Sequence, residues 1–180
     1  MKNTLVILTV IFAFSQVIAA VRGNEGKQPV KEGVKKLAPI IGTWKIEGER
    51  EETPFSQLGR VRTTAICQWS SDSQFVVSNE VGEIPGGESH ELAIYTFNRA
   101  EDDYSYYGIP GTGGKPYWGR LEIHDSLWTY PGQFKVDGKL ILTRTTNLFI
   151  SPDLILYKVQ FSTDGKRWVT MGQGKETRLR

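Results

Sequence analysis

The chain has 180 residues and a formal net charge of +2 at pH 7, with 39% hydrophobic and 23% charged residues. A charge so close to neutral gives no electrostatic basis for binding nucleic acid or an anionic membrane surface, so we expect neither partner. Cys67 is the single cysteine of the sequence, and an internal disulfide is therefore excluded.

The first nineteen residues, MKNTLVILTVIFAFSQVIA, combine an early lysine with a long apolar run and a small-residue end. This pattern is typical of a cleavable secretory signal, with Val17 and Ala19 at the two small-residue positions of the peptidase site. A membrane anchor is the alternative, because the run from Thr4 to Ala20 is nearly long enough to span a bilayer. We expect residues 1–19 to be removed, which gives a secreted or periplasmic protein without stable membrane insertion.

Residues 20–30, AVRGNEGKQPV, are small, polar and unpatterned, and we interpret them as a flexible leader. Residues 31–180 are long enough for one domain with its own core, and we expect a monomer. At the start of this domain Val34, Leu37 and Ile41 follow helical spacing, and Pro39 limits the length of any helix. The pattern predicts a short helix or turn that lies across one end of the following sheet.

From Gly42 onward the hydrophobic period changes to two: Trp44, Ile46 and Gly48 alternate with charged residues. Stretches of the same kind follow at residues 61–69, 74–81, 90–98, 103–109, 119–125, 126–136, 139–150, 154–163 and 167–173. About ten short strands without an amphipathic helix between them indicate an antiparallel meander. A sheet of this many strands tends to curl and close, which removes its exposed edges.

Two Asp-Gly pairs mark the C-terminal third, Asp137-Gly138 in KVDGKL and Asp164-Gly165 in STDGKRW. Asp-Gly between alternating apolar segments is the strongest short-range signal of a tight hairpin turn. We therefore expect consecutive antiparallel strands on both sides of each pair.

These features carry a resemblance to a known family. The triplet Gly42-Thr43-Trp44 after a short helix, the series of hairpins, and the ending YKVQFSTDGKRWVTMGQGKETR resemble the calycin superfamily of lipocalin-like barrels. More narrowly, residues 35–180 resemble an uncharacterised family of secreted bacterial lipocalin-like proteins. The fold class we predict is all-β: an antiparallel up-and-down meander of about ten strands, closed into a lipocalin-like β-barrel with a short N-terminal helix.

The resemblance also implies a structural plug. In calycins the tryptophan of the first strand closes one barrel end under a basic residue of the last strand, which here implies Trp44 under Arg178, or less well under Arg180. Gly42 would let the backbone bend tightly into the strand. The chain is also similar to the haem-binding nitrobindins, whose first strand carries Gly-x-Trp-x-Gly, but Ile46 stands at the third key position of that pattern.

Aromatic residues occur on nearly every expected strand, and we expect most of them to pack in the core and rim. A barrel of this size can also keep a cavity for one small ligand. The aromatic residues that we expect to contact this ligand are Trp69, Tyr95, Tyr106, Trp118, Trp128 and Tyr157. The glycine-rich and tyrosine-rich stretch 103–118 is the candidate mouth of the cavity.

Arg144 has two possible orientations. If it shares the inward face with Leu142, its buried guanidinium needs an acidic partner or an anionic ligand, such as a carboxylate. In the alternative, Thr143, Thr145 and Asn147 face inward and Arg144 lies in solvent. We include Arg144 among the candidate ligand-binding residues on the first interpretation.

Signals for catalysis, metals and cofactors are weak. His90 and His124 are the two histidines, neither belongs to a zinc-like cluster, and we expect both in solvent, without a metal site or a cofactor. His124 is the candidate to test if haem were bound. We name no catalytic residue, since no nucleophile elbow is present.

We expect a barrel that binds a small apolar or amphipathic molecule in its interior. One alternative is an enzyme, of cyclase or isomerase type, that uses the same cavity. The other is a surface interaction module with a filled barrel. The fold alone cannot choose among them, because function depends on the site.

Overall fold

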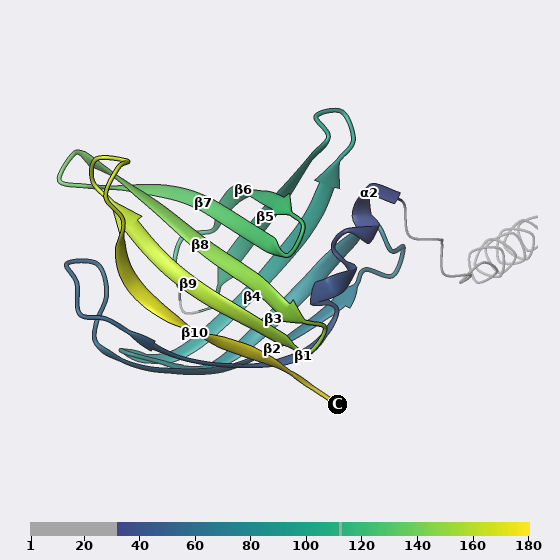
Figure 1. Ribbon diagram of the computed structural model, residues 1–180, viewed down its shortest axis with the longest axis horizontal. Helices are drawn as coiled ribbons and strands as arrows, with labels where there is room; N and C mark the ends of the chain where they lie inside the picture. Colours follow the sequence, from purple (N-terminus) through teal and green to yellow (C-terminus); the bar gives the residue numbers. More distant parts are fainter. Residues whose placement is uncertain (1–31, 112) are drawn as a thin grey trace, which may run out of the picture.

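The computed structural model describes residues 32–111 and 113–180, so the expected signal (1–19) and leader (20–30) lie outside the described residues. The described chain forms a closed ten-stranded antiparallel barrel with a short helix at one end (Figure 1). Its elements are α2 (Glu32–Lys35), the 3-10 turn η1 (Ala38–Ile40), β1 (Gly42–Arg50), β2 (Gly59–Trp69), β3 (Phe75–Ile84), β4 (Gly87–Asn98), β5 (Asp103–Pro110), β6 (Tyr117–His124), β7 (Leu127–Val136), β8 (Lys139–Ser151), β9 (Leu154–Ser162) and β10 (Val169–Leu179). In these ranges we find no helix with the length and apolar character needed to cross a membrane.

Each strand pairs with its neighbours in sequence, and β1 pairs with β10 to close the barrel. The closing ladder runs from Thr43 opposite Leu179 to Arg50 opposite Gly172. Closure gives the first and last strands the backbone partners that an open sheet would leave exposed. The predicted fold class, an up-and-down antiparallel barrel with a short N-terminal helix, is confirmed.

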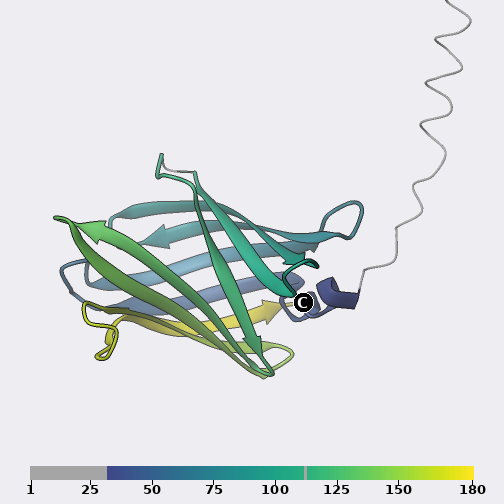
Figure 2. The same ribbon diagram turned by 90° about the horizontal axis from the view of Figure 1, so that it is seen from above.

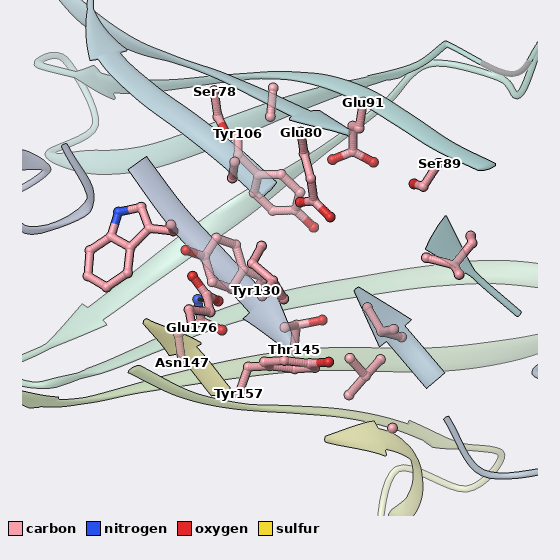
Figure 3. Close-up of a pocket in the computed structure, with 18 of the residues that line it drawn as sticks. Ser78, Glu80, Ser89, Glu91, Tyr106, Tyr130, Thr145, Asn147, Tyr157 and Glu176 are labelled. Carbon is pink, nitrogen blue, oxygen red and sulfur yellow. Dashed lines mark hydrogen bonds between the residues drawn. The ribbon is translucent and has the colours of Figure 1, made fainter. Parts of the chain in front are cut away.

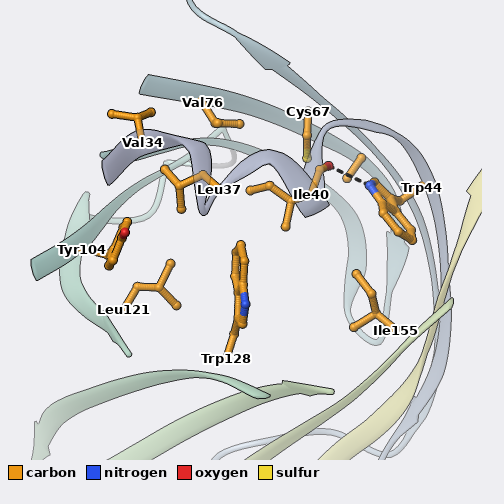
Figure 4. Close-up of a cluster of buried hydrophobic side chains, with 11 residues drawn as sticks. Val34, Leu37, Ile40, Trp44, Cys67, Val76, Tyr104, Leu121, Trp128 and Ile155 are labelled. Carbon is orange, nitrogen blue, oxygen red and sulfur yellow. Dashed lines mark hydrogen bonds between the residues drawn. The ribbon is translucent and has the colours of Figure 1, made fainter. Parts of the chain in front are cut away.

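One end of the barrel is sealed by α2 and η1. Val34, Leu37 and Ile40 point from this segment into a buried cluster that includes Trp44 and Trp128 (Figure 4). The helical spacing of these apolar residues explains the seal, because it places them on one face of the segment. The predicted short helix across one end of the sheet is therefore present, and we call this end the closed end.

The seam between β6 and β7 is the least paired part of the barrel. The two strands share only three residue pairs, from Glu122 opposite Thr129 to His124 opposite Leu127. Beyond these pairs the strands diverge toward the end opposite the helix (Figure 2). Backbone pairing between the two strands is therefore confined to the part next to their turn.

The two Asp-Gly pairs behave differently. Asp137 and Gly138 both have positive φ, 50° and 75°, and form the tight β7–β8 turn that the sequence predicts. In the second pair only Gly165 has positive φ, and residues 163–168 make a longer loop between β9 and β10. The Asp164 carboxylate accepts hydrogen bonds from the backbone N–H groups of residues 166 and 167, both at 2.8 Å, and thereby stabilises the longer loop.

Candidate functional site

A cavity of about 590 Å³ occupies the barrel interior (Figure 3). Ile40 and Trp44 border it at the closed end, and Phe55, Ile84 and Met171 border it toward the opposite end. The helical seal therefore gives the cavity a floor, and its mouth lies among the hairpin loops at the other end.

The floor is built around Trp44, which is 1% exposed. Its indole Nε1 donates a hydrogen bond to the backbone oxygen of Ile40 at 2.8 Å, so the buried N–H is satisfied. The guanidinium carbon of Arg178 lies 4.2 Å from the centroid of the Trp44 ring. Gly42 has a φ of 134°, which residues with a side chain rarely adopt, and a Cβ at this position would require Arg178 Nη1 to move. The structure thus brings the three expected plug residues together.

Arg178 also ties the last strand to the seal. Its guanidinium donates to the backbone oxygens of Ile41 and Pro39, the latter at 2.9 Å. Arg180, the less favoured candidate for this role, forms an ion pair with Asp153 instead, at 2.9 Å. The basic residue above the tryptophan is therefore Arg178.

Five tyrosines line the cavity: Tyr95, Tyr106, Tyr117, Tyr130 and Tyr157. The rings of Tyr106 and Tyr130 have their centroids 5.2 Å apart, and Tyr106 and Tyr117 are 6.0 Å apart. Since Tyr117 belongs to β6 and Tyr130 to β7, this cluster spans the seam where the two strands separate. Burial raises the pKa of Tyr95 and of Tyr130 well above the usual value, so both remain neutral hydroxyl groups.

Glycines on neighbouring strands make room for three of these rings. A Cβ would overlap the ring of Tyr106 at Gly119, of Tyr117 at Gly108, and of Tyr157 at Gly48 or Gly174. Each of these tyrosines therefore lies flat against a strand rather than filling the centre of the barrel. The glycines explain how an interior rich in aromatic residues still contains a cavity.

Four glutamates also line the cavity: Glu49 of β1, near the mouth, Glu80 of β3, Glu91 of β4 and Glu176 of β10. Burial, reinforced by the charge of Glu80, raises the pKa of Glu176 to about 7, although Asn147 Nδ2 donates to Glu176 Oε1 at 3.1 Å and partly opposes this rise. Burial likewise raises the pKa of Glu91, against the lowering effect of a hydrogen bond with Tyr117. These carboxyl groups give the cavity an acidic wall.

Sequence reasoning did not single out these glutamates. A signal was available in β10, where Gly172, Gly174 and Glu176 alternate on one face. An acidic residue in register with two glycines that face the interior must itself face the interior. The same alternation in β3 places Glu80 on the face of Ser78, a neutral residue that also lines the cavity.

Cys67 lies on the cavity wall near the floor and is buried. Its thiol donates a hydrogen bond to Ser78 Oγ at 3.3 Å, and burial raises its pKa to about 11. A neutral buried thiol is a poor nucleophile, so Cys67 acts here as a small apolar side chain.

The six aromatic residues expected to contact a ligand divide into two groups. Tyr95, Tyr106 and Tyr157 line the cavity. Trp69, Trp118 and Trp128 do not: Trp128, 1% exposed, and Trp69 belong to the closed-end core, and Trp118 is 74% exposed on the outer face of β6. Of the candidate mouth at residues 103–118, Tyr106 and Tyr117 reach the cavity.

Arg144 lies outside the barrel, so the inward interpretation is wrong. Its Nε donates to Gln160 Oε1 at 2.9 Å, and its guanidinium carbon lies 4.1 Å from the centroid of the Trp168 ring. Thr145 and Asn147 line the cavity instead. The reason is strand alternation: Asn147 and the buried Ile141 fix the odd-numbered residues of β8 on the inner face, which turns Arg144 outward.

Histidines contribute nothing to the cavity. His90 and His124 are both exposed, and neither borders the interior, so the haem ligand considered above is not at the cavity. In residues 32–111 and 113–180 we find no group of three or more histidine, cysteine or acidic side chains placed to hold a metal ion. The polar groups of the site are phenols, aliphatic hydroxyl groups, carboxyl groups, one amide and the guanidinium of Arg50.

Comparisons with known proteins bear on the fold. No protein-family model and no curated protein matches the sequence. The chain is similar to the crystal structure of Rv2717c from M. tuberculosis, with a TM-score of 0.57, 12% identity, and coverage of 84% of this chain and 100% of that chain. It is also similar to the S-type phycobiliprotein lyase CPES from Guillardia theta, with a TM-score of 0.55, 13% identity, and coverage of 81% and 92%. At such identities the likeness shows the fold alone, a closed antiparallel barrel.

Proposed function

We propose that this protein is a secreted or periplasmic lipocalin-like carrier that holds one small amphipathic molecule inside its barrel. The observation that carries the proposal is the cavity of about 590 Å³, with an apolar floor and a polar wall. Its volume falls in the range of about 300–1,000 Å³ that is usual for small-molecule sites. Export and the monomeric state rest on the sequence pattern, and membership of a secreted lipocalin-like family rests on the resemblance.

Apolar and polar side chains of the cavity would receive different parts of the ligand. The cavity offers apolar surface at both ends, from Ile40, Trp44 and Ala65 at the floor and from Phe55, Ile84 and Met171 toward the mouth. Affinity comes from apolar area removed from water, at about 25 cal/mol per Å² before ordering costs. The tyrosine hydroxyls and the carboxyl groups would receive the polar end. This arrangement supports an amphipathic ligand over a wholly apolar one.

The proposal is tested by calorimetric titration with decan-1-ol as a neutral amphipathic probe. We expect one molecule to bind per chain. Thr145→Trp places a large ring in the cavity and should abolish binding. Thr146→Trp is the matched control, because the adjacent residue faces outward and should bind the probe as the wild type does. The carrier proposal fails if the wild type binds neither decan-1-ol nor a charged probe with the same tail, or if the two variants lose binding equally.

A second candidate function, an isomerase-like enzyme, is favoured by one observation. Glu176 has a pKa of about 7 inside a cavity, which suits a group that must both accept and donate a proton at neutral pH. To separate the two functions, the protein is incubated with a bound ligand, and the ligand recovered at successive times is identified by mass spectrometry. Conversion that stops in Glu176→Gln supports the enzyme, and recovery of an unchanged ligand supports the carrier.

A further inference from the structure

Acidic residues outnumber basic residues in the lining of the cavity. Glu80, Glu91 and Glu176 line its interior, and the adjacent Glu49 and Arg50 line it at the end of β1, where Arg50 is the single basic residue among the described residues that do so. Arg50 ends β1 and therefore lies toward the mouth, away from the floor. An anionic ligand head would meet the repulsion of three carboxyl groups, whereas a cationic head would be attracted by them.

Asn147 gives independent evidence, because one of its buried polar atoms lacks a hydrogen-bond donor among the described residues. Its side chain is buried, with 9% exposure, and borders the cavity beside Glu176 (Figure 3). Nδ2 donates to Glu176 Oε1 at 3.1 Å, but Oδ1 is buried and has no hydrogen-bond partner in the part of the chain that the structure describes. Because an unpaired buried carbonyl oxygen is costly, a ligand N–H at this point would stabilise the site.

The aromatic wall favours the same kind of ligand. The rings of Tyr130 and Tyr157 lie around the part of the cavity where Glu176 and Asn147 project (Figure 3). The face of an aromatic ring attracts cations, and the attraction increases when the cation is removed from water. Carboxyl groups, an amide oxygen and ring faces together form an environment suited to an organic ammonium group.

We propose that the ligand carries a protonated nitrogen on an apolar body, with the ammonium group at Glu176 and Asn147. Glu176 pairs with Ile46 close to the floor, so the apolar part extends from there toward the mouth. The proposal rests on the proposed carrier function and specifies the ligand class for the same cavity. An ammonium group has several N–H donors, so it can serve the Glu176 carboxylate and Asn147 Oδ1 together. A neutral alcohol has one O–H donor and can satisfy only one of them.

The test compares three probes with the same tail at pH 8: decylammonium and decanoate, titrated below their micelle concentrations, and decan-1-ol, titrated below its solubility limit. An alkylammonium group resembles a lysine side chain, with a pKa of about 10.4, and is protonated at this pH. We expect decylammonium to bind at least about tenfold more tightly than decan-1-ol, the difference of a charge-assisted hydrogen bond, and decanoate to bind most weakly. Equal affinities, or a preference for decanoate, would overturn the proposal.

Glu176→Gln keeps the shape of the side chain and removes its charge. The affinity for decylammonium should fall about tenfold, while the affinity for decan-1-ol stays within about twofold. Glu83→Gln is the matched control, because the same substitution is then made at an exposed position on the outer face of β3. If the two variants change decylammonium binding equally, the assignment of the ammonium group to Glu176 is wrong.

The outcomes separate this proposal from the carrier function. Binding of decan-1-ol without a preference for decylammonium overturns the ammonium ligand and leaves the carrier in place. Failure of all three probes to bind overturns both.

Discussion

Glu176 should make the fold less stable as pH rises, and Glu176→Gln should remove this effect. The pKa of the carboxyl group rises from 4.5 to about 7 on folding, mainly because of burial. Between these two values the folded state binds more protons than the unfolded state, so the free energy of unfolding falls as pH increases. The shift corresponds to about 3 kcal/mol, an upper value because the carboxyl group borders the cavity and any water in it.

The assay is urea unfolding at pH 4.5 and pH 8 for the wild type, Glu176→Gln and the outward control Glu83→Gln. The difference in free energy of unfolding between Glu176→Gln and the wild type should grow by up to about 3 kcal/mol in favour of the variant as pH rises through this window. Other titrating groups cancel in this difference, because both proteins contain them. If the wild type and Glu176→Gln change in parallel with pH, Glu176 is not buried as the structure has it.

Three further predictions concern the frame of the site. Trp44→Phe leaves the Ile40 carbonyl without its donor and removes buried volume, so urea unfolding should show a loss of about 2–4 kcal/mol; an unchanged stability would contradict the role of Trp44 in the seal. Gly174→Ala places a Cβ against the backbone of β1, and amide hydrogen exchange should increase along the β1–β10 ladder more than along β3–β4; a uniform or absent increase would argue against local opening. Cys67, with a pKa of about 11, should react with a disulfide reagent at pH 8 much more slowly in the folded protein than in urea; equal rates would show that the thiol is accessible.

Much of the fold could be predicted from the sequence because alternation and turns are local signals. A period of two defined the strands, and short connections placed neighbouring strands side by side. The helical spacing of Val34 and Leu37 predicted the seal for the same reason. The pairing of Trp44 with Arg178 joins the two ends of the barrel, and it came from the resemblance rather than from any local pattern.

The site was harder to predict because it depends on which face of each strand is inward. Trp118 is large and apolar, but Tyr117 and Gly119 take the inner positions beside it and turn it outward. In β8, Thr145 faces inward, so the adjacent Arg144 faces outward. A single strand does not reveal this choice when both of its faces carry mixed residues.

The sequence did not predict the acidic wall of the cavity, for a different reason. Charged residues in alternating strands usually mark the face in solvent, and Glu176 and Glu80 break this rule because they line a cavity. Their position follows from distant strands that together enclose the cavity. A site of this kind becomes visible only when the barrel is closed.

The most direct test of the account is a crystal structure of the protein grown with a saturating concentration of decylammonium. The account predicts one probe inside the barrel, with its nitrogen within hydrogen-bond distance of Glu176 and of Asn147 Oδ1, and with its chain toward the mouth. An empty cavity, or a probe bound only on the outer surface of the barrel, would contradict it.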